Sequence, residues 1–453
     1  MSVTTLSHEL ADIVGNPYLL TEPADCAAYA VQGVTPALVV SPGSIEELSQ
    51  VMTVAHAAGA AVVPWGGGTQ QSWGYPPSRL DLVVRTTRLN RVSTYKPEDV
   101  TIAVEAGITL AALDTILGRH GHMLPVDAPL PRSATLGGVL ATAVDGPRRL
   151  GYGTLRDLLI GIQVVEATGR VTKAGGLVVK NVSGYDMMKL YLGSLGSLAI
   201  IVSAGFKLIP RAQAAATIGC RFATPDSAFA LIDALHTGQL TPMAVELLAQ
   251  TGPIDQTGNA RLGSVAALFN RPACYGVLVW AEGLPAAVER HVRDVTRLAE
   301  QSGAEAVQTF TDDAHADLWA RVADLPQTAV IAPGELVVRL TCLPGDLAPA
   351  LRDAGDIAAR HGLALLTVAR ALSGVAYLRL QADTADDRAT AALQAWHQTM
   401  LRRWPHLTIL AGAPTAKAGL SVWGSAPAGQ AIMQRIKHAF DPEGRLNHGR
   451  FIV

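Results

Sequence analysis

The sequence predicts an α+β protein of two domains followed by a short tail. The chain has 453 residues, which is more than one ordinary hydrophobic core accommodates. Residues 36–210 alternate short apolar strands with helices, whereas the strands of residues 215–420 alternate with long amphipathic helices. This change of pattern places the domain boundary near residue 213. We therefore expect domains at 1–212 and 213–425, with a tail at 426–453.

Apolar runs and turn residues define the elements of the first half. Ser44 followed by Glu47 forms a capping box, which predicts a helix that runs to about Gly59. A hairpin is expected at 158–173, turning at Thr168-Gly169. The remaining strands are expected at 36–42, 61–65, 80–86, 101–107 and 197–210, and the remaining helices at 109–121, 134–144 and 185–193.

In the second half, four amphipathic segments are separated by strand-like segments. The helices are expected at 225–237, 285–302, 347–361 and 384–403, and strands at 275–282, 334–341 and 375–381. This order predicts a sheet with helices on one face, organised as two ferredoxin-like halves.

Composition excludes several classes of protein. The formal net charge is −2, which argues against a nucleic-acid partner. No apolar stretch reaches about 18 residues and no signal peptide is recognisable, so we expect a soluble, cytoplasmic protein. The cysteines are far apart and form no CxxC, so they predict no iron–sulfur cluster of the usual spacing. They are Cys26, Cys220, Cys274 and Cys342.

Three glycine-containing segments are candidates for a binding site. The first, Gly66-Gly67-Gly68-Thr69-Gln70, directly follows a predicted strand, and its N–H groups can form an anion-binding nest. With 43 glycines, such a triplet arises by chance about 0.4 times per chain, so it is weak alone. It matches neither GxGxxG nor the P-loop motif, which disfavours the usual nicotinamide and ATP folds.

The other two segments are weaker candidates when taken singly. Ser133-Ala134-Thr135-Leu136-Gly137-Gly138 opens a helix of small residues, which suits either a phosphate at the helix start or close packing of a helix on a sheet. The third segment is Gly193-Ser194-Leu195-Gly196-Ser197. Taken alone, it is better explained as a glycine C-cap followed by a turn than as a binding loop.

The order and spacing of the three segments are more specific. Residues 30–212 resemble the FAD-binding domain of the vanillyl-alcohol oxidase family, also called the PCMH type. The landmarks are Gly66-Gly67-Gly68-Thr69, the proline loop before Ala134, the hairpin at Thr168-Gly169, and residues 180–200. The segment Leu446-Asn447-His448-Gly449-Arg450 is also similar to the family's C-terminal ending. The resemblance implies a PCMH-type FAD-binding domain of two α/β subdomains, a C-terminal substrate or cap domain, and a tail that returns to the FAD domain.

The resemblance also implies which residues hold the cofactor. In the family the first segment cradles the FAD diphosphate and the second lies along the flavin and the ribityl chain. The implied FAD-binding residues are Gly66, Gly67, Gly68, Thr69, Gln70, Ser133, Thr135, Gly137, Gly138, Thr142, Gly153 and Ile200. Some relatives attach FAD through a histidine of the first loop. Because residues 65–74 contain none, we expect non-covalent FAD.

Two departures from the catalytic members of the family shape the functional hypothesis. Their histidine metal ligands in a HxGDGNxH-like motif are missing, and no pair of the 12 histidines has ligand spacing, so we expect no metal site. No acid or base in 215–420 is an obvious catalyst. His448 and Arg450 fit, by residue type, the base and the carboxylate-binding cation that oxidation of a 2-hydroxy acid needs, with Tyr185 and Lys180 as further candidates. An Arg or His near a C-terminus is more often a surface residue or a dipole partner than a catalyst, so each candidate also has a structural explanation.

Residues 146–161 make the chain most similar to the accessory flavin subunits of bacterial glycolate oxidases. The resemblance implies partners, a catalytic flavin subunit and an iron–sulfur subunit, a small 2-hydroxy-acid substrate, and membrane association that is at most peripheral. Two alternatives stay open. One is a self-sufficient FAD-dependent dehydrogenase of lactate or glycolate, and the other is a scaffold subunit with a vestigial FAD site.

Overall fold

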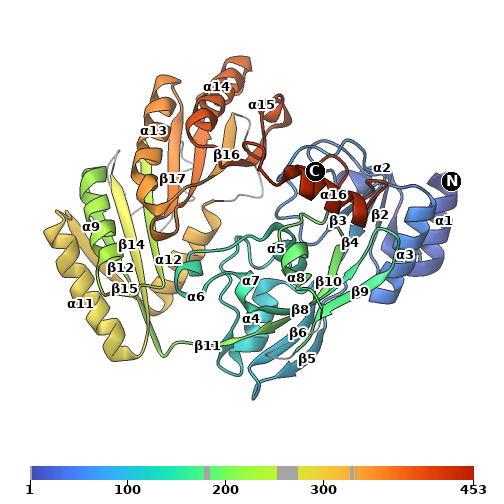
Figure 1. The fold of residues 1–453 in the computed structure, drawn as a ribbon, viewed down its shortest axis with the longest axis horizontal. Helices are drawn as coiled ribbons and strands as arrows, with labels where there is room; N and C mark the ends of the chain where they lie inside the picture. The colour runs from blue at the N-terminus through green and yellow to red at the C-terminus, as the bar shows by residue number, and fades with distance from the viewer. Residues whose placement is uncertain (1–2, 178–183, 252–273, 327–330, 333) are drawn as a thin grey trace.

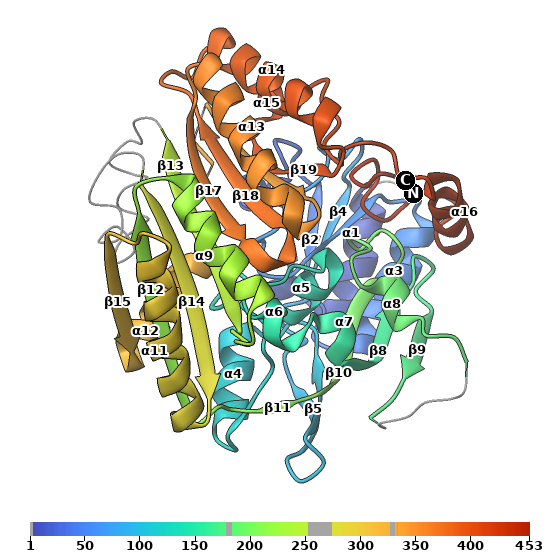
Figure 2. The ribbon, with the colours of Figure 1, turned by 60° about the vertical axis from the view of Figure 1, so that its left-hand side comes forward.

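The computed structural model describes residues 3–177, 184–251, 274–326, 331–332 and 334–453. Two bodies of structure lie side by side (Figure 1, Figure 2). The first is built on a four-stranded and a five-stranded sheet, and the second on one eight-stranded sheet. This is the predicted α+β class. Of the helices in the described part of the chain, none combines the length and hydropathy of a membrane span.

The four-stranded sheet places the first glycine segment. Its spatial order is β1 (Leu19–Leu20), β2 (Leu38–Val40), β4 (Leu82–Arg85), β3 (Val62–Trp65). The last three are parallel, and the apolar runs of β2 and β4 are buried as parallel strands usually are. Helices α3 (Ile45–Ala57) and α1 (Val3–Val14), the second of which was not predicted, supply apolar residues to the same core.

Helix α3 starts at the predicted cap. The Ser44 hydroxyl accepts the Glu47 N–H at 3.1 Å. The Glu47 carboxylate accepts the N–H of Gly43 at 2.7 Å, one residue before the cap. The predicted capping box is therefore formed in a shifted version, and it still satisfies two N–H groups at the helix start.

The five-stranded sheet is antiparallel throughout. Its order is β5 (Val92–Lys96), β6 (Thr101–Glu105), β10 (Ile200–Lys207), β8 (Leu159–Val165), β9 (Val171–Gly175). The predicted hairpin is confirmed as β8–β9, with Gly169 at a φ of +87° in its turn. The predicted strand at 197–210 is in fact two strands, because after β10 the chain turns into β11 (Ile209–Pro210) to pair with β7 (His122–Met123).

Helices α4 (Leu110–Gly118) and α5 (Leu136–Thr142) belong to this sheet's body. Two predicted helices are shorter than expected, since α5 has seven residues and the segment 185–193 forms only one four-residue helix. The remaining short helices are η1 (Asn16–Tyr18), α2 (Pro23–Ala27), α6 (Arg149–Tyr152), α7 (Leu155–Leu158), α8 (Met188–Tyr191), η3 (Pro344–Asp346), η4 (Ala371–Ser373) and α15 (Pro414–Lys417).

The eight-stranded sheet consists of two ferredoxin-like halves, as predicted. The first half runs β12 (Ala214–Phe222), α9 (Pro225–Thr237), β13 (Ala244–Thr251), β14 (Tyr275–Gly283), α11 (Pro285–Gln301), β15 (Ala306–Thr311). The second runs β16 (Glu335–Thr341), α13 (Leu347–Arg360), β17 (Ala364–Arg370), β18 (Val375–Gln381), α14 (Asp387–Arg403), β19 (Leu407–Gly412). The spatial order is β15-β12-β14-β13-β17-β18-β16-β19, so the antiparallel pair β13–β17 joins the halves.

The two faces of this sheet have different neighbours. The four long helices cover one face and enclose a core with it. On the other face, residues such as Trp280 and Tyr377 share a core with residues of the first body, to which α12 (Asp312–Asp324) also contributes. The sheet therefore presents side chains toward the N-terminal half.

The C-terminal tail lies against the first sheet. After α16 (Gln430–Phe440), which lies beside that sheet in Figure 1, the chain runs alongside β3. Val62 N–H donates to the Arg445 carbonyl at 2.7 Å, and Asn447 N–H donates to the Val62 carbonyl at 2.9 Å. We retain 1–212, 213–425 and 426–453 as the proposed division into domains and tail.

Candidate flavin site

The first glycine segment begins where β3 ends, and several of its amides have no hydrogen-bond partner among the described residues. Gly66 to Gly68 directly follow Trp65, the last residue of β3, and Gly68 has a φ of +74°. Among the described residues, no acceptor receives a hydrogen bond from the N–H of Gly67, Gly68 or Thr69. Free, adjacent N–H groups of this kind form a concave donor surface for an anion.

The first and second glycine segments are in direct contact. A Cβ built on Gly67 would lie 1.7 Å from the Ser133 carbonyl oxygen, and one on Gly66 would lie 2.0 Å from Thr135 Oγ1. No side chain fits at either position. Two stretches some 65 residues apart in sequence are thus held together by the absence of side chains.

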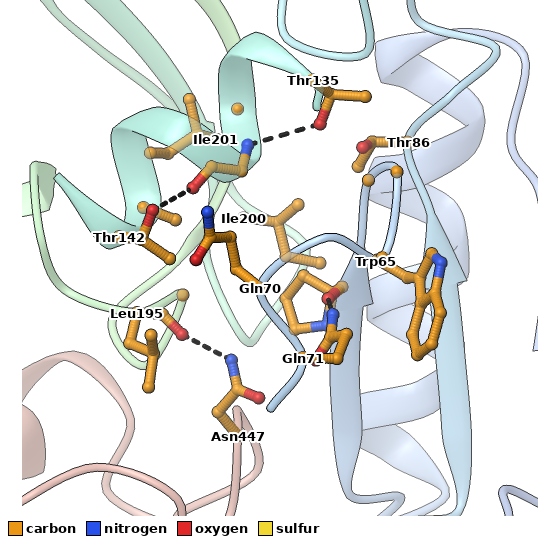
Figure 3. A pocket seen from close by; sticks show the side chains of 18 of the residues that line it. Trp65, Gln70, Gln71, Thr86, Thr135, Thr142, Leu195, Ile200, Ile201 and Asn447 are labelled. Carbon is orange, nitrogen blue, oxygen red and sulfur yellow. Dashed lines mark hydrogen bonds between the residues drawn. The ribbon is translucent and has the colours of Figure 1, made fainter. Parts of the chain in front are cut away.

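Helix α5 continues the site from the second segment. Thr135, which is 2% exposed, caps the helix by accepting the Gly138 N–H at 3.4 Å. Thr142 in the last turn donates to the Gly138 carbonyl at 2.8 Å (Figure 3). Gly137 lies against the backbone of Ala106 and tolerates little extra volume. The helix is short because Ala143 adopts a left-handed conformation with a φ of +49°.

The third segment is a turn fixed to the end of α5. Gly193 N–H donates to the Leu140 carbonyl at 2.9 Å, and Leu195 N–H donates to the Ala141 carbonyl at 2.7 Å. Asn447 of the tail donates to the Leu195 carbonyl at 2.6 Å (Figure 3). The turn interpretation of this segment is therefore right, and the same turn also forms a wall of the site.

A pocket with about 680 Å³ of empty space is formed where these segments meet (Figure 3). The site residues implied by the sequence that line it are Gly66, Gly67, Gly68, Thr69, Gln70, Thr135, Gly137, Gly138, Thr142, Ile200 and Arg450. Further lining residues that the sequence did not single out include Gln71, Thr86, Ile201 and Asn447. No sequence signal marks Gln71, Thr86 or Ile201, and Asn447 was noted only as part of the C-terminal ending, because each reaches the pocket only through the fold.

Three of the implied residues lie elsewhere. Ser133 is exposed and contributes its carbonyl to the contact with Gly67. Gly153 lines a smaller pocket with Asp145 and Thr154, beyond the end of α5. His448 is exposed and its carbonyl accepts the Ser78 N–H at 3.0 Å. The proposed base therefore sits outside the pocket.

The other catalytic candidates are Tyr185, Lys180 and Arg450. Tyr185 is 91% exposed, and Lys180 lies outside the described residues. Arg450 does line the pocket, but its Nη atoms donate to Gln71 Oε1, Asn447 Oδ1 and the carbonyls of Gln71 and Trp73, at 2.8–3.1 Å. With both Nη atoms occupied and only Nε without a partner among the described residues, the guanidinium has no pair of free N–H groups for a two-point clamp on a substrate carboxylate, so the role first considered for Arg450 does not suit its position.

A buried ionic cluster that the sequence did not predict lies beyond α5. Arg370 of β17 is 5% exposed and donates to the carboxylate of Asp145 and, at 2.9 Å, to its carbonyl. Arg149 pairs with the same carboxylate. Glu246 of β13 is 1% exposed, lies 3.9 Å from Arg370 Nε, and has no hydrogen-bond partner among the described residues. Burial raises the pKa of Glu246 to about 8, although the charge of Arg370 opposes the shift.

Metal-ligating groups do not gather anywhere in the described ranges. In those ranges, no three His, Cys, Asp or Glu side chains lie close enough together to hold an ion.

Free amides, two glycine segments in contact and a buried guanidinium together define a pocket suited to an anionic group such as a diphosphate. Comparison with known proteins identifies the cofactor. Residues 36–186 match the model of the FAD binding domain, and residues 211–411 and 416–451 match that of the C-terminal domain of FAD linked oxidases. The chain belongs to the family of FAD-linked oxidases and is an FAD-dependent oxidoreductase of the PCMH-type fold.

Curated relatives extend over nearly the whole chain. The glycolate oxidase subunit GlcD of Bacillus subtilis is 26% identical over 428 residues, which cover 92% of this chain and 89% of that protein. The D-lactate dehydrogenase of Archaeoglobus fulgidus is 26% identical over 425 residues, covering 92% and 91%. Among solved structures, p-cresol methylhydroxylase with substrate bound superposes with a TM-score of 0.74 at 15% identity, covering 99% of this chain and 96% of that one. The last comparison shows a shared fold.

Proposed function

We propose that this chain is the FAD-binding subunit of an enzyme that oxidises a small 2-hydroxy acid, such as glycolate or lactate, to the 2-oxo acid. A catalytic flavin subunit and an iron–sulfur subunit are its proposed partners and receive the electrons. The two relatives, a glycolate oxidase subunit and a D-lactate dehydrogenase, support this substrate class. The pocket, with its free amides at Gly67, Gly68 and Thr69, supports retained FAD binding over a vestigial site.

Oxidation of a 2-hydroxy acid removes a hydride from the α-carbon and a proton from the hydroxyl group. Bound FAD supplies the two-electron acceptor. The protein must supply a cation for the substrate carboxylate and a base for the hydroxyl proton. Both must stand near the end of α5, if that helix lies along the flavin as the family resemblance implies. The residues at that end are the buried cluster around Asp145.

The observation that carries the proposal is how the charged groups of this cluster are paired. Asp145 follows Thr142 of the pocket by three residues, and its carboxylate holds both Arg370 and Arg149. The two guanidinium groups that could bind a substrate carboxylate are thus already paired with a carboxylate of the chain itself. This supports a chain that binds the 2-hydroxy acid weakly on its own and relies on a catalytic partner.

The same cluster also favours the second candidate, a self-sufficient dehydrogenase. Glu246 is a buried carboxyl group with a pKa near 8 next to a guanidinium, which is the combination that a general base near neutral pH requires. If substrate displaced Asp145 from Arg370, Glu246 would stand next to the bound carboxylate.

Anaerobic mixing of the FAD-loaded chain with glycolate, D-lactate and L-lactate separates the two candidates. We expect no bleaching of the visible flavin band by the chain alone. The contrary result would be bleaching by the chain alone that is lost in Glu246→Gln while FAD stays bound. That outcome would replace the first candidate with the second.

We also propose that the FAD is held without a covalent bond. Among the described lining residues there is no histidine, cysteine or tyrosine. Acid precipitation of the yellow protein is therefore expected to leave all flavin in the supernatant, measured by its absorbance. Flavin that stays with the washed pellet would contradict this.

A further inference from the structure

The segment Gln71–Tyr75 follows the first glycine loop and is held by side chains from distant parts of the chain. Lys417 of α15 is 2% exposed and donates to the carbonyls of Ser72 at 2.8 Å and Gly74 at 2.7 Å. Arg450 is 2% exposed and donates to the carbonyls of Gln71 and Trp73 at 2.9 and 3.1 Å. Alternate carbonyls thus point to two different cations, which fixes the path of the segment.

Neutral contacts complete this arrangement. Gln32 donates to the carbonyls of Gly74 and Tyr75, both at 3.2 Å, and its own oxygen accepts from Lys417 Nζ at 2.5 Å. The Arg450 carbonyl in turn accepts the Tyr75 N–H at 3.1 Å. The segment, α15 and the tail therefore form one hydrogen-bonded unit behind the glycine loop.

The two cations have no acidic partner. Both are paired only with neutral oxygen atoms, and no carboxylate of the described residues forms an ion pair with either. Nε of Arg450 is buried without any hydrogen-bond partner in the described chain, although Arg450 lines the flavin pocket. Two buried positive charges without a counterion are costly, since burial of a charge is normally offset by an opposite one.

Other buried cations of the chain show the usual arrangement. Lys437 pairs with Asp441, and Arg379 pairs with Glu335 at 2.6 Å. The missing acid near Lys417 and Arg450 is therefore a local property of the flavin site. FAD carries two negative charges on its diphosphate, which is the opposite charge that this place lacks.

We propose that Arg450 and Lys417 together supply the counter-charge of the FAD diphosphate, with Arg450 at the pocket wall and Lys417 as a positioning residue one layer behind it. This inference needs only that the chain binds FAD and does not depend on the substrate proposed above. It assigns Arg450 to cofactor binding.

Protonation of Lys417 provides an independent signature. Burial, and next the charge of Arg450, lowers the pKa of Lys417 to about 7. The neighbouring charged groups are Arg450 and, over the ring of Trp73, Arg339, while Gln32 is neutral. A nearby diphosphate would raise this pKa, so FAD binding should take up a proton above pH 7 and weaken as the pH rises from 7 to 9. Below pH 7 the lysine is already charged and the dependence should disappear.

The test compares FAD with riboflavin, which has no phosphate, on the refolded or deflavinated full chain. Lys417→Gln retains N–H donors for the carbonyls but removes the charge, and Arg450→Met removes the second charge. We expect each variant to lose about tenfold in FAD affinity with less than about threefold change for riboflavin, by fluorescence titration. Lys207→Gln, a change at an exposed lysine, is the control and should alter neither affinity.

Calorimetry in buffers of different ionisation enthalpy gives the second measurement. At pH 8 the wild-type protein should take up as much as one proton per FAD bound, and the Lys417→Gln variant should take up none. Equal losses for FAD and riboflavin would show that the cations merely support the fold and would overturn the proposal. Unchanged FAD affinity in both variants, or the same proton uptake in Lys417→Gln, would overturn it as well. Failure of the substrate proposal would appear only in the anaerobic assay and would leave these results unaffected.

Discussion

Replacing Gly67 by alanine is expected to weaken FAD binding about a hundredfold, equivalent to about 2.7 kcal/mol. The added Cβ would stand 1.7 Å from the Ser133 carbonyl oxygen, so the first and second glycine segments would have to separate. The free amides of Gly67, Gly68 and Thr69 would then no longer face the wall formed by α5. Titration of the flavin-free protein with FAD, followed by fluorescence quenching, measures the effect.

Gly355→Ala is the matched control for this substitution. Gly355 lies inside α13, and nothing stands within 4 Å of its added Cβ. We expect unchanged FAD affinity and a gain in stability of up to about 1 kcal/mol, because alanine favours the helix. Gly137→Ala should fall between the two, since its Cβ would lie 2.9 Å from Ala106 Cβ. Normal FAD binding by Gly67→Ala would mean that contact between the two segments does not shape the site.

Arg370→Met is expected to lower the free energy of unfolding by about 3–5 kcal/mol. The change leaves the buried carboxyl group of Glu246 without a guanidinium beside it, and Asp145 keeps only its pair with Arg149. Methionine preserves much of the volume, so the loss reports the charge and not a cavity. The midpoint and slope of a urea denaturation curve measure it.

A pair at the surface serves as the comparison. Arg403 and Asp353 also form an ion pair, but the Arg403 side chain is 61% exposed. Arg403→Met should cost no more than about 1 kcal/mol, as exposed pairs do. If Arg370→Met cost no more than Arg403→Met, the ion pairs of the buried cluster would not stabilise the fold more than a surface pair does.

Local patterns were sufficient to predict most of the fold. The periodicity of the segments at 225–237, 285–302, 347–361 and 384–403 matches α9, α11, α13 and α14 within a few residues. The predicted two-halved sheet follows from the order of strands and helices alone. The errors lie where conformation depends on neighbours. Helix α5 ends early because Ala143 turns left-handed against the third glycine segment, and α8 is one turn long.

The candidate site was predicted less evenly. Residues whose proposed role depends on having no side chain, such as Gly66, Gly67 and Gly137, could be proposed from the sequence because a glycine is visible there, and all three line the pocket. Side chains that reach the site through long-range contacts were missed or misassigned. Lys417 was not considered, Asn447 was noted only as part of the C-terminal ending, and Arg450 was given a substrate role that its hydrogen bonds do not suit.

The sequence by itself determined the class of protein and where the main chain leaves room for a cofactor. Hydrophobic period indicated the fold class and the position of glycines indicated the room for a ligand, whereas the FAD-binding family came from the resemblance that the order and spacing of these segments carry. Only the tertiary structure decided which charges meet there. Lys417 and Arg450 are up to about 380 positions away from residues 71–75 along the chain. Asp145 and Arg370 are 225 positions apart. Electrostatic energy depends on distance in space and on exclusion of water, and neither is set until the sheets, the helices and the tail pack together.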